Sequence, residues 1–174
     1  MNYKEYMVKV FDDGEKHWFF DDKRHREDGP AVESSNGSKY WYLNGLLHRE
    51  GGPAIEYSSG DKHWYLNGEL HREDGPAVEW SNGTKEWWLN GHLHREDGPA
   101  CEYAAGYKEW YVNGLRHRED GPAVEYANGP KKWYLNGNFL SEEEFLKQIA
   151  LLKLTSVDAK VIELDGVKYR LIPI

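Results

Sequence analysis

The sequence has very little cysteine: Cys101 is the single one among 174 residues. One cysteine excludes an intramolecular disulfide and favours a reducing compartment. No apolar run resembling a signal peptide stands near residue 1, and no stretch approaches the length of a membrane-spanning helix. We therefore expect a cytoplasmic protein.

The sequence also lacks a basic excess. Its 22 Lys and Arg residues are outnumbered by 30 Asp and Glu residues, which gives a net charge of −8. Both signs are spread along the whole chain, so no basic stripe could follow a phosphate backbone, and we expect no direct binding of nucleic acid. The same charge argues against an anionic membrane surface. Hydrophobic residues make up 39% and aromatic residues 14%, which fits a thin sheet carrying large rings better than a thick globular core.

What the sequence does contain is a strict repeat. Six tryptophans follow one another at steps of 23 residues, at Trp18, Trp41, Trp64, Trp87, Trp110 and Trp133. Five histidines keep the same step, at His25, His48, His71, His94 and His117. A fixed period of this size is typical of repeat proteins, in which each unit contacts mainly its neighbours. Because no unit adds a nucleophile or an unlike ligand set, we expect a protein that is not an enzyme.

Each unit reads as β-hairpins closed by glycine turns. An Asn-Gly pair, which suits a type I′ turn, stands at 44–45, 67–68, 90–91, 113–114 and 136–137. The first unit has Asp21 and Asp22 there, a poorer pair, so we expect its N-terminal edge to be less regular. The other turn keeps only its glycine, at Gly14, Gly37, Gly60, Gly83, Gly106 and Gly129. Since Ala105 stands before one of these glycines, we predict a type I turn with a G1 bulge, in which only the glycine needs positive φ.

The bulged turn fixes the strand register. It places Glu33 opposite Lys39, and the same pairing recurs in the later units, whereas a two-residue loop would oppose Glu79 to Glu86. Alternation then puts Ala31, Trp41 and their equivalents on a packed face. Val32 and Tyr42 fall on the other face, together with one position, just before the repeated tryptophan, whose residue type differs from unit to unit. We interpret this variation as a sign that the position is exposed to solvent. The expected fold is therefore mainly β, an elongated single-layer antiparallel ribbon of hairpin repeats.

The second face carries a long aromatic track, which we predict to bind a partner. Its candidate partner-binding residues are Tyr42, Tyr65, Trp88, Tyr111 and Tyr134 in one column, Tyr57, Trp80, Tyr103 and Tyr126 in a second, and Glu86 and Glu109 at the variable position. Tyr and Trp are frequent anchors of protein interfaces.

The segment His-Arg-Glu-Asp-Gly-Pro, found at 25–30, 71–76, 94–99 and 117–122, allows several readings. A metal ladder, acid–base catalysis by His with Asp, and a phosphate site are the functional alternatives to a structural bend. The bend is favoured because Gly51 replaces the aspartate in the second unit, and glycine cannot replace a catalytic or liganding carboxylate. We expect Asp to cap backbone N–H groups, and His and Arg to brace the bend, with Arg pairing to an acid of a neighbouring unit. The repeated Trp and His residues are thus structural, and no catalytic residue, metal or cofactor is expected.

The period ends after Gly137, which divides the chain into a repeat array, 1–139, with about five and a half units, and a C-terminal part, 140–174. Ser141 and Glu144 form a capping box that starts a helix, with an apolar stripe at Phe145, Leu146, Ile149, Leu152 and Leu154. A last hairpin at 161–172 turns at Asp165 and Gly166. We expect this part to cap the array. A homodimer interface or a partner-docking element is the alternative.

The unit Trp-Tyr-Leu-Asn-Gly-x-Leu-His-Arg-Glu-Asp-Gly-Pro-Ala resembles MORN repeats (membrane occupation and recognition nexus) over residues 11–139. Those repeats are also 23-residue β-hairpins with an aromatic residue before a glycine turn. The His-Arg-Glu-Asp-Gly-Pro variant looks like repeats in proteins of phages and giant viruses, and related repeats occur in bacterial antitoxins. The resemblance implies a non-catalytic scaffold that holds another protein.

From this resemblance we expect a phage-encoded inhibitor, acting in the host cytoplasm, that binds and blocks a host defence protein such as a nuclease. One alternative is an antitoxin or immunity protein that neutralises a toxin, and another is a membrane-associated MORN scaffold.

Overall fold

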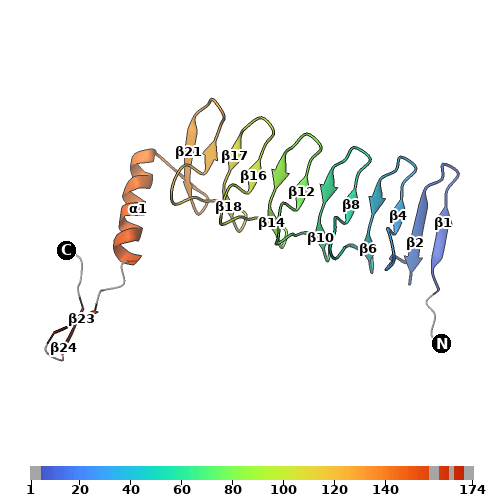
Figure 1. Ribbon diagram of the computed structural model, residues 1–174, viewed down its shortest axis with the longest axis horizontal. Helices are drawn as coiled ribbons and strands as arrows, with labels where there is room; N and C mark the ends of the chain where they lie inside the picture. Colours follow the sequence, from blue (N-terminus) through green and yellow to red (C-terminus); the bar gives the residue numbers. More distant parts are fainter. Residues whose placement is uncertain (1–4, 157–160, 165–166, 171–174) are drawn as a thin grey trace.

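The computed structural model describes residues 5–156, 161–164 and 167–170. Its hairpins stand side by side in one long row, with a helix at the C-terminal end (Figure 1). In these residues a 14-stranded antiparallel sheet is formed by β1 (Met7–Val10), β2 (Lys16–Phe20), β3 (Lys23–Arg24), β4 (Val32–Glu33), β5 (Lys39–Tyr40), β8 (Ile55–Glu56), β9 (Lys62–His63), β12 (Val78–Glu79), β13 (Lys85–Glu86), β16 (Cys101–Glu102), β17 (Lys108–Glu109), β20 (Val124–Glu125), β21 (Lys131–Leu135) and β22 (Asn138–Leu140). The predicted fold class is confirmed.

A second row of small hairpins runs beside this sheet. Its pairs are β6 (Tyr42–Leu43) with β7 (Leu46–Leu47), β10 (Tyr65–Leu66) with β11 (Glu69–Leu70), β14 (Trp88–Leu89) with β15 (His92–Leu93), and β18 (Tyr111–Val112) with β19 (Leu115–Arg116). Each small hairpin bonds to the one before it, because the turn glycine donates its N–H to that hairpin, as Gly91 does to the carbonyl of Leu70 at 3.0 Å. The two rows together make the elongated ribbon.

The repeated tryptophan stands where the chain passes from one row to the other. Trp41 lies between β5 and β6, and its N–H donates to the carbonyl of Ala54 at 2.8 Å while its carbonyl accepts from the N–H of His48 at 3.1 Å. The first bond reaches the next unit's main sheet and the second closes the small hairpin. The tryptophan backbone therefore links successive units, which explains why the step never slips.

The Asn-Gly turns adopt the predicted conformation, with both central residues at positive φ, for example 52° at Asn44 and 85° at Gly45. Asp21 and Asp22 take the same geometry, with φ of 48° and 57°. β2 pairs in register with both β1 and β3, so the expected irregularity of the N-terminal edge is wrong. The neighbouring pairing overrides the poor turn preference of the two aspartates.

The bulged turns are also confirmed in five of the six predicted places, where the glycine has positive φ and the preceding residue does not, at Gly14, Gly37, Gly60, Gly83 and Gly106. Gly129 is the exception, because Pro130 follows it and proline disfavours that backbone conformation in the preceding residue. The predicted register holds throughout: Glu56 pairs with Lys62 inside its hairpin and with Lys39 of the previous hairpin. Glu and Lys thus alternate across the sheet from β2 to β21.

Burial differs in part from the expected two faces. The alanine column is fully buried, but the valine column on the opposite face is buried too, from 6% exposed at Val32 to 1% at Val124. Trp41 and Tyr42 are both half-buried. In a single-layer sheet with such short strands, rings on each face cover the small side chains beside them, so neither face is simply packed or simply open. The interpretation of the variable position as solvent-exposed fails at Glu109, which is only 4% exposed.

Helix α1 (Glu142–Ser156) packs on β21 at the end of the row (Figure 1). Phe145 and Ile149 are buried against Leu135, and the Phe145 ring lies 4.8 Å from that of Trp133. The capping box is confirmed, because Glu144 accepts a hydrogen bond from the Ser141 N–H at 2.9 Å. This supports the helix as a cap of the array.

The predicted apolar stripe of the helix is only partly right. Leu146 and Leu152 are 57% and 48% exposed, since the helix meets the ribbon along the narrow line of Phe145 and Ile149. The expected last hairpin is present as β23 (Val161–Leu164) and β24 (Val167–Arg170). Its turn at Asp165 and Gly166 lies outside the described residues, as does the part of the expected second strand beyond residue 170.

Candidate functional site

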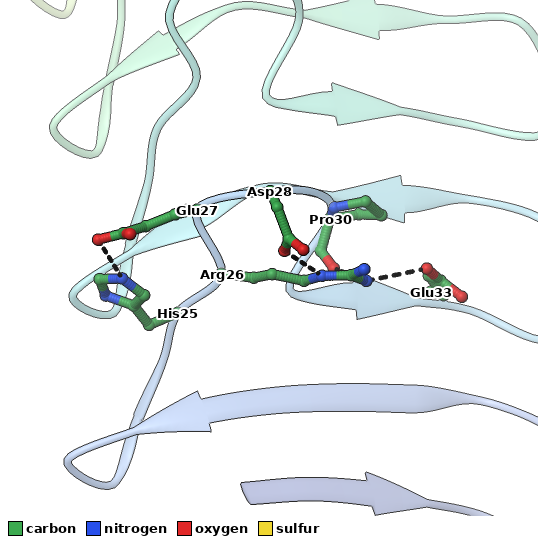
Figure 2. Close-up of polar contacts among 6 residues, drawn as sticks. All are labelled: His25, Arg26, Glu27, Asp28, Pro30 and Glu33. Carbon is green, nitrogen blue, oxygen red and sulfur yellow. Dashed lines mark hydrogen bonds and ion pairs between the residues drawn. The ribbon is translucent and has the colours of Figure 1, made fainter. Parts of the chain in front are cut away.

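The His-Arg-Glu-Asp loops, residues 25–30, 48–53, 71–76, 94–99 and 117–122, are organised around their arginine. Arg26 donates from Nε to Asp28 at 2.9 Å, and from Nη1 to the Pro30 carbonyl at 3.3 Å and to Glu33 at 3.2 Å (Figure 2). The other side of its guanidinium faces the Trp18 ring, with the central carbon 4.2 Å from the ring centroid. Arg72, Arg95 and Arg118 make the same set of contacts.

These contacts confirm that the arginine braces the bend, but two details of the prediction are wrong. The acids that hold Arg26 belong to its own unit, while its link to the preceding unit is the stack on Trp18. Asp28 accepts from the arginine side chain rather than mainly capping backbone N–H groups, and the Arg26 hydrogen bond is the largest cause that lowers the pKa of this carboxyl. The planar guanidinium can hold a carboxylate, a carbonyl and a ring face together, as an ammonium group cannot.

The repeated histidine holds the Asn-Gly turn of its own unit in place. The Nδ1 of His71 accepts a hydrogen bond from the N–H of Asn90 at 3.2 Å, and its Nε2 faces Glu73 at 3.8 Å. The histidines that begin the other His-Arg-Glu-Asp loops make the same bond to their own Asn-Gly turn. A metal would need several such side chains together, and the described residues hold no cluster of three or more His, Cys, Asp or Glu side chains suited to a metal ion.

The second unit shows what the loop aspartate contributes. Gly51 takes its place at a φ of 71°, a conformation that none of the loop aspartates adopts. Arg49 keeps its bonds to Pro53 and Glu56, at 3.0 and 2.7 Å, and its stack on Trp41. The bend therefore tolerates loss of the aspartate, in line with a structural role.

The predicted aromatic track is real in part. The rings of Tyr40, Tyr57, His63 and Trp80 meet edge to face, with successive ring centroids 6.0, 5.2 and 5.2 Å apart. Burial between these rings lowers the pKa of His63. The line continues through Glu86, whose carboxylate accepts the indole N–H of Trp80 at 3.3 Å and that of Trp88 at 2.9 Å.

Further along the same face the rings change from edge contacts to stacking. Tyr107 lies between Tyr103 and Tyr126, with centroids 4.7 and 4.6 Å apart and planes within about 25° of parallel. Trp80 and Tyr126 are each 39% exposed, the most open of the predicted aromatic residues. We call this line of Tyr57, His63, Trp80, Tyr103, Tyr107 and Tyr126 the aromatic face.

The other predicted column, Tyr42, Tyr65, Trp88, Tyr111 and Tyr134, is half-buried throughout. Several of its rings serve internal contacts: the hydroxyl of Tyr111 donates to Glu109 at 2.5 Å, and Arg116 lies between the rings of Tyr111 and Tyr134 at 5.7 and 5.4 Å. Arg116 also donates to Glu109 at 3.1 Å. Glu109 is thus the buried centre of a polar cluster and offers little of its carboxylate to a partner.

Sequence reasoning missed Tyr107, Arg116 and the ring role of His63. Tyr107 stands directly after a bulge glycine, where other units carry the polar residues Ser38, Asp61 or Thr84. An aromatic residue at a position that is otherwise polar was the signal that could have identified it. Arg116 stands where three other units have leucine, at Leu47, Leu70 and Leu93, in the unit that also places Glu109 at the variable position. The clue to their pairing was that this unit alone combines an arginine at the first position with a glutamate at the second.

Comparison with known proteins gives no family assignment, since no family model and no curated protein matches the chain. The resemblance to MORN repeats therefore stays a prediction. Within the part of the chain that the structure describes, no helix has both the length and the apolar character needed to cross a membrane.

Proposed function

We propose that this protein is a non-catalytic scaffold of the MORN-like kind that binds another protein through its aromatic face. The observation that carries the proposal is the presence of two runs of contacting rings on one face, Tyr57–His63–Trp80 and Tyr103–Tyr107–Tyr126, across neighbouring hairpins. Its two most open members, Trp80 and Tyr126, directly follow strands β12 and β20, whose positions the sheet fixes. Rigid Tyr and Trp side chains lose little conformational entropy on binding and make large contacts, which favours protein recognition.

The charge of the chain suggests the chemistry of the partner. With a net charge of −8, the scaffold attracts a protein whose surface is basic. A nuclease has such a surface where it holds nucleic acid. An inhibitor that blocks a host defence nuclease, encoded by a phage and acting in the host cytoplasm, is the form of this function that we favour.

An antitoxin would use the same face in the same way and would differ in its target, a toxin. The half-buried Glu86 beside Trp80 gives both forms an acidic group among the rings. The net charge lends no support to the third possibility, a scaffold on an anionic membrane.

The proposal is tested by affinity purification of tagged protein from a bacterial lysate, with identification of the retained proteins by mass spectrometry. Wild type is compared with a double variant, Trp80→Ala with Tyr126→Ala. Phe139→Ala is the matched control, because Phe139 is a 65% exposed ring outside the aromatic face. We expect a specific partner to be retained by wild type and control and lost from the double variant. Circular dichroism checks that all three are folded, and equal retention by a folded double variant would rule the aromatic face out.

A further inference from the structure

The side of the ribbon that carries the His-Arg-Glu-Asp loops is not flat. Between successive loops lie four grooves of similar build, with volumes of about 580, 510, 720 and 740 Å³ from the first loop to the last. The third is bounded by Arg72, Glu73 and Asp74 of one loop and Glu96 of the next, and Trp87 and Leu89 also line it. We call these four spaces the inter-loop grooves.

Each groove keeps an acidic excess after its internal ion pairs are made. The charge of Arg72 is matched by Asp74 at 2.8 Å and Glu79 at 3.0 Å. Glu73 is different: its side chain is 84% exposed, and it faces the His71 imidazole at 3.8 Å, which is beyond hydrogen-bond length. Glu96 and Glu119 repeat this arrangement, with 85% and 67% of the side chain exposed. Each of these three loops therefore has one exposed glutamate at its edge whose charge is only weakly balanced by the loop histidine.

The spacing of the grooves selects the form of a ligand. Two strands separate equivalent points of neighbouring units, and strands lie about 4.8 Å apart, so the grooves repeat about every 9.6 Å. An extended polypeptide rises about 3.3 Å per residue, and a polyproline II helix about 3.1 Å. Three residues of either form span about 9.3–9.9 Å, but side chains three residues apart point to opposite sides of an extended strand and to the same side of a polyproline II helix, which has three residues per turn. Every third side chain of a polyproline II segment therefore meets an equivalent groove.

We propose that the inter-loop grooves bind a polyproline II segment of a partner protein that carries Lys or Arg at every third residue. The aliphatic stem of each basic side chain packs beside the leucine or valine of the groove, and its charged end meets the exposed glutamate at the rim. Each contact is weak alone, and four in register act together. This surface is separate from the aromatic face and adds a second, sequence-selective contact.

The test uses labelled synthetic peptides and fluorescence anisotropy with the whole protein. One peptide carries five lysines separated by Ala-Pro, and the other carries five lysines separated by Ala-Pro-Ala, so that charge is equal and only the period differs. We expect the period-three peptide to bind about tenfold more tightly, because the mismatch of the other grows by about 3 Å at each groove. Equal affinity for the two peptides, or no binding of either, would overturn the proposal.

Variants locate the binding surface. The triple variant Glu73→Gln, Glu96→Gln, Glu119→Gln should lower affinity for the period-three peptide about tenfold. A control with the same loss of charge, Asp12→Asn, Glu69→Gln, Glu142→Gln, alters exposed acids away from the grooves and should change it less than about twofold. Equal losses in the two triple variants would show general charge attraction and contradict the proposal. Peptide binding should survive in the Trp80→Ala, Tyr126→Ala variant, so this result is independent of the aromatic face.

Discussion

The guanidinium of Arg95 lies over the indole ring of Trp87, with its central carbon 4.0 Å from the ring centroid. Trp87 closes one unit's main-sheet strand, and Arg95 opens the next unit's loop, so this stack joins two units. The same guanidinium donates to Asp97 and Glu102 within its own unit, at 2.8 and 3.0 Å. One side chain therefore fixes the shape of a loop and its attachment to the previous hairpin.

Replacing this arginine by lysine should weaken the array. Arg95→Lys keeps the charge but cannot make the parallel ring contact and the two carboxylate bonds together, so we expect the free energy of unfolding to fall by about 1–2 kcal/mol. Arg49→Lys is the matched comparison and should cost less, because Gly51 removes one of the carboxylate partners. Urea unfolding followed by tryptophan fluorescence measures both, and an equal or larger loss at Arg49 would contradict this account.

Acid should weaken the same loops. The hydrogen bond from Arg95 and its charge lower the pKa of the Asp97 carboxyl below its ordinary value of 3.8. A carboxyl whose pKa is lower in the folded state stabilises the fold above its unfolded pKa, and this contribution disappears as pH falls through the folded value. In Asp97→Asn the urea midpoint should be lower than in wild type at pH 7, and this difference should disappear at a pH well below the ordinary value of 3.8. A difference between the two proteins that is the same at both pH values would show that charge is not the cause.

Glu109 should be needed for stability rather than for binding. Glu109→Gln removes the charge opposite Arg116 in a site only 4% exposed, and we expect a loss of about 2 kcal/mol. Glu86→Gln, at the equivalent position of the previous unit, keeps an oxygen for only one of the two indole N–H groups, but it breaks no ion pair with an arginine and should cost about 1 kcal/mol. Chemical unfolding of the two variants separates them, and similar stabilities would mean that the buried pair contributes nothing.

The turn at Asp21 and Asp22 should become more stable when its second residue is replaced by glycine. Asp22 is held at a φ of 57°, where every later unit has glycine. Asp22→Gly removes the steric cost of the left-handed conformation and should raise the free energy of unfolding by about 0.5–1 kcal/mol. The control Gly45→Asp should lower it by a similar amount. Thermal unfolding checks both, and a neutral or destabilising Asp22→Gly would show that the aspartate makes compensating contacts.

Cys101 should be inert in the folded protein. Its side chain is 2% exposed, and burial together with the nearby Glu86 and Glu109 raises the pKa of the thiol to about 12. Since the thiolate is the reactive form, an aromatic disulfide reagent at pH 8 should label Cys101 only after denaturant is added. Cys101→Val should change stability by less than about 0.5 kcal/mol, because Val78 and Val124 fill the same column. Fast labelling without denaturant would refute the buried environment.

Much of the ribbon could be predicted because its determinants are local. Asn90 before Gly91 demands a type I′ turn, a bulge glycine sets which residues face each other, and Ser141 with Glu144 starts the helix. Each of these depends on the backbone conformations that two or three adjacent residues can adopt. Because the units repeat, a correct prediction for one unit holds for the others. The failure at Gly129 is of the same local kind, since Pro130 follows it.

The candidate site could be predicted only in outline. Alternation placed the rings on one face, but it did not show that Tyr107 would stack between Tyr103 and Tyr126, or that Glu109 would be enclosed. The stack of Tyr107 on Tyr126 and the contact of Arg116 with Tyr134 join side chains of different units, which become neighbours only when hairpins align. The partner of Arg95 was misassigned for a similar reason, because the path of the loop brings Glu102 of its own unit within reach.

The sequence by itself determined the period, the turn types, the strand register and the place where the array ends, because each follows from steric limits on a few consecutive residues. The tertiary structure alone decided which rings stay open, which carboxylates are matched, and where grooves form between loops. Those properties arise between units, where packing and charge depend on side chains that the chain brings together only after every hairpin is in place.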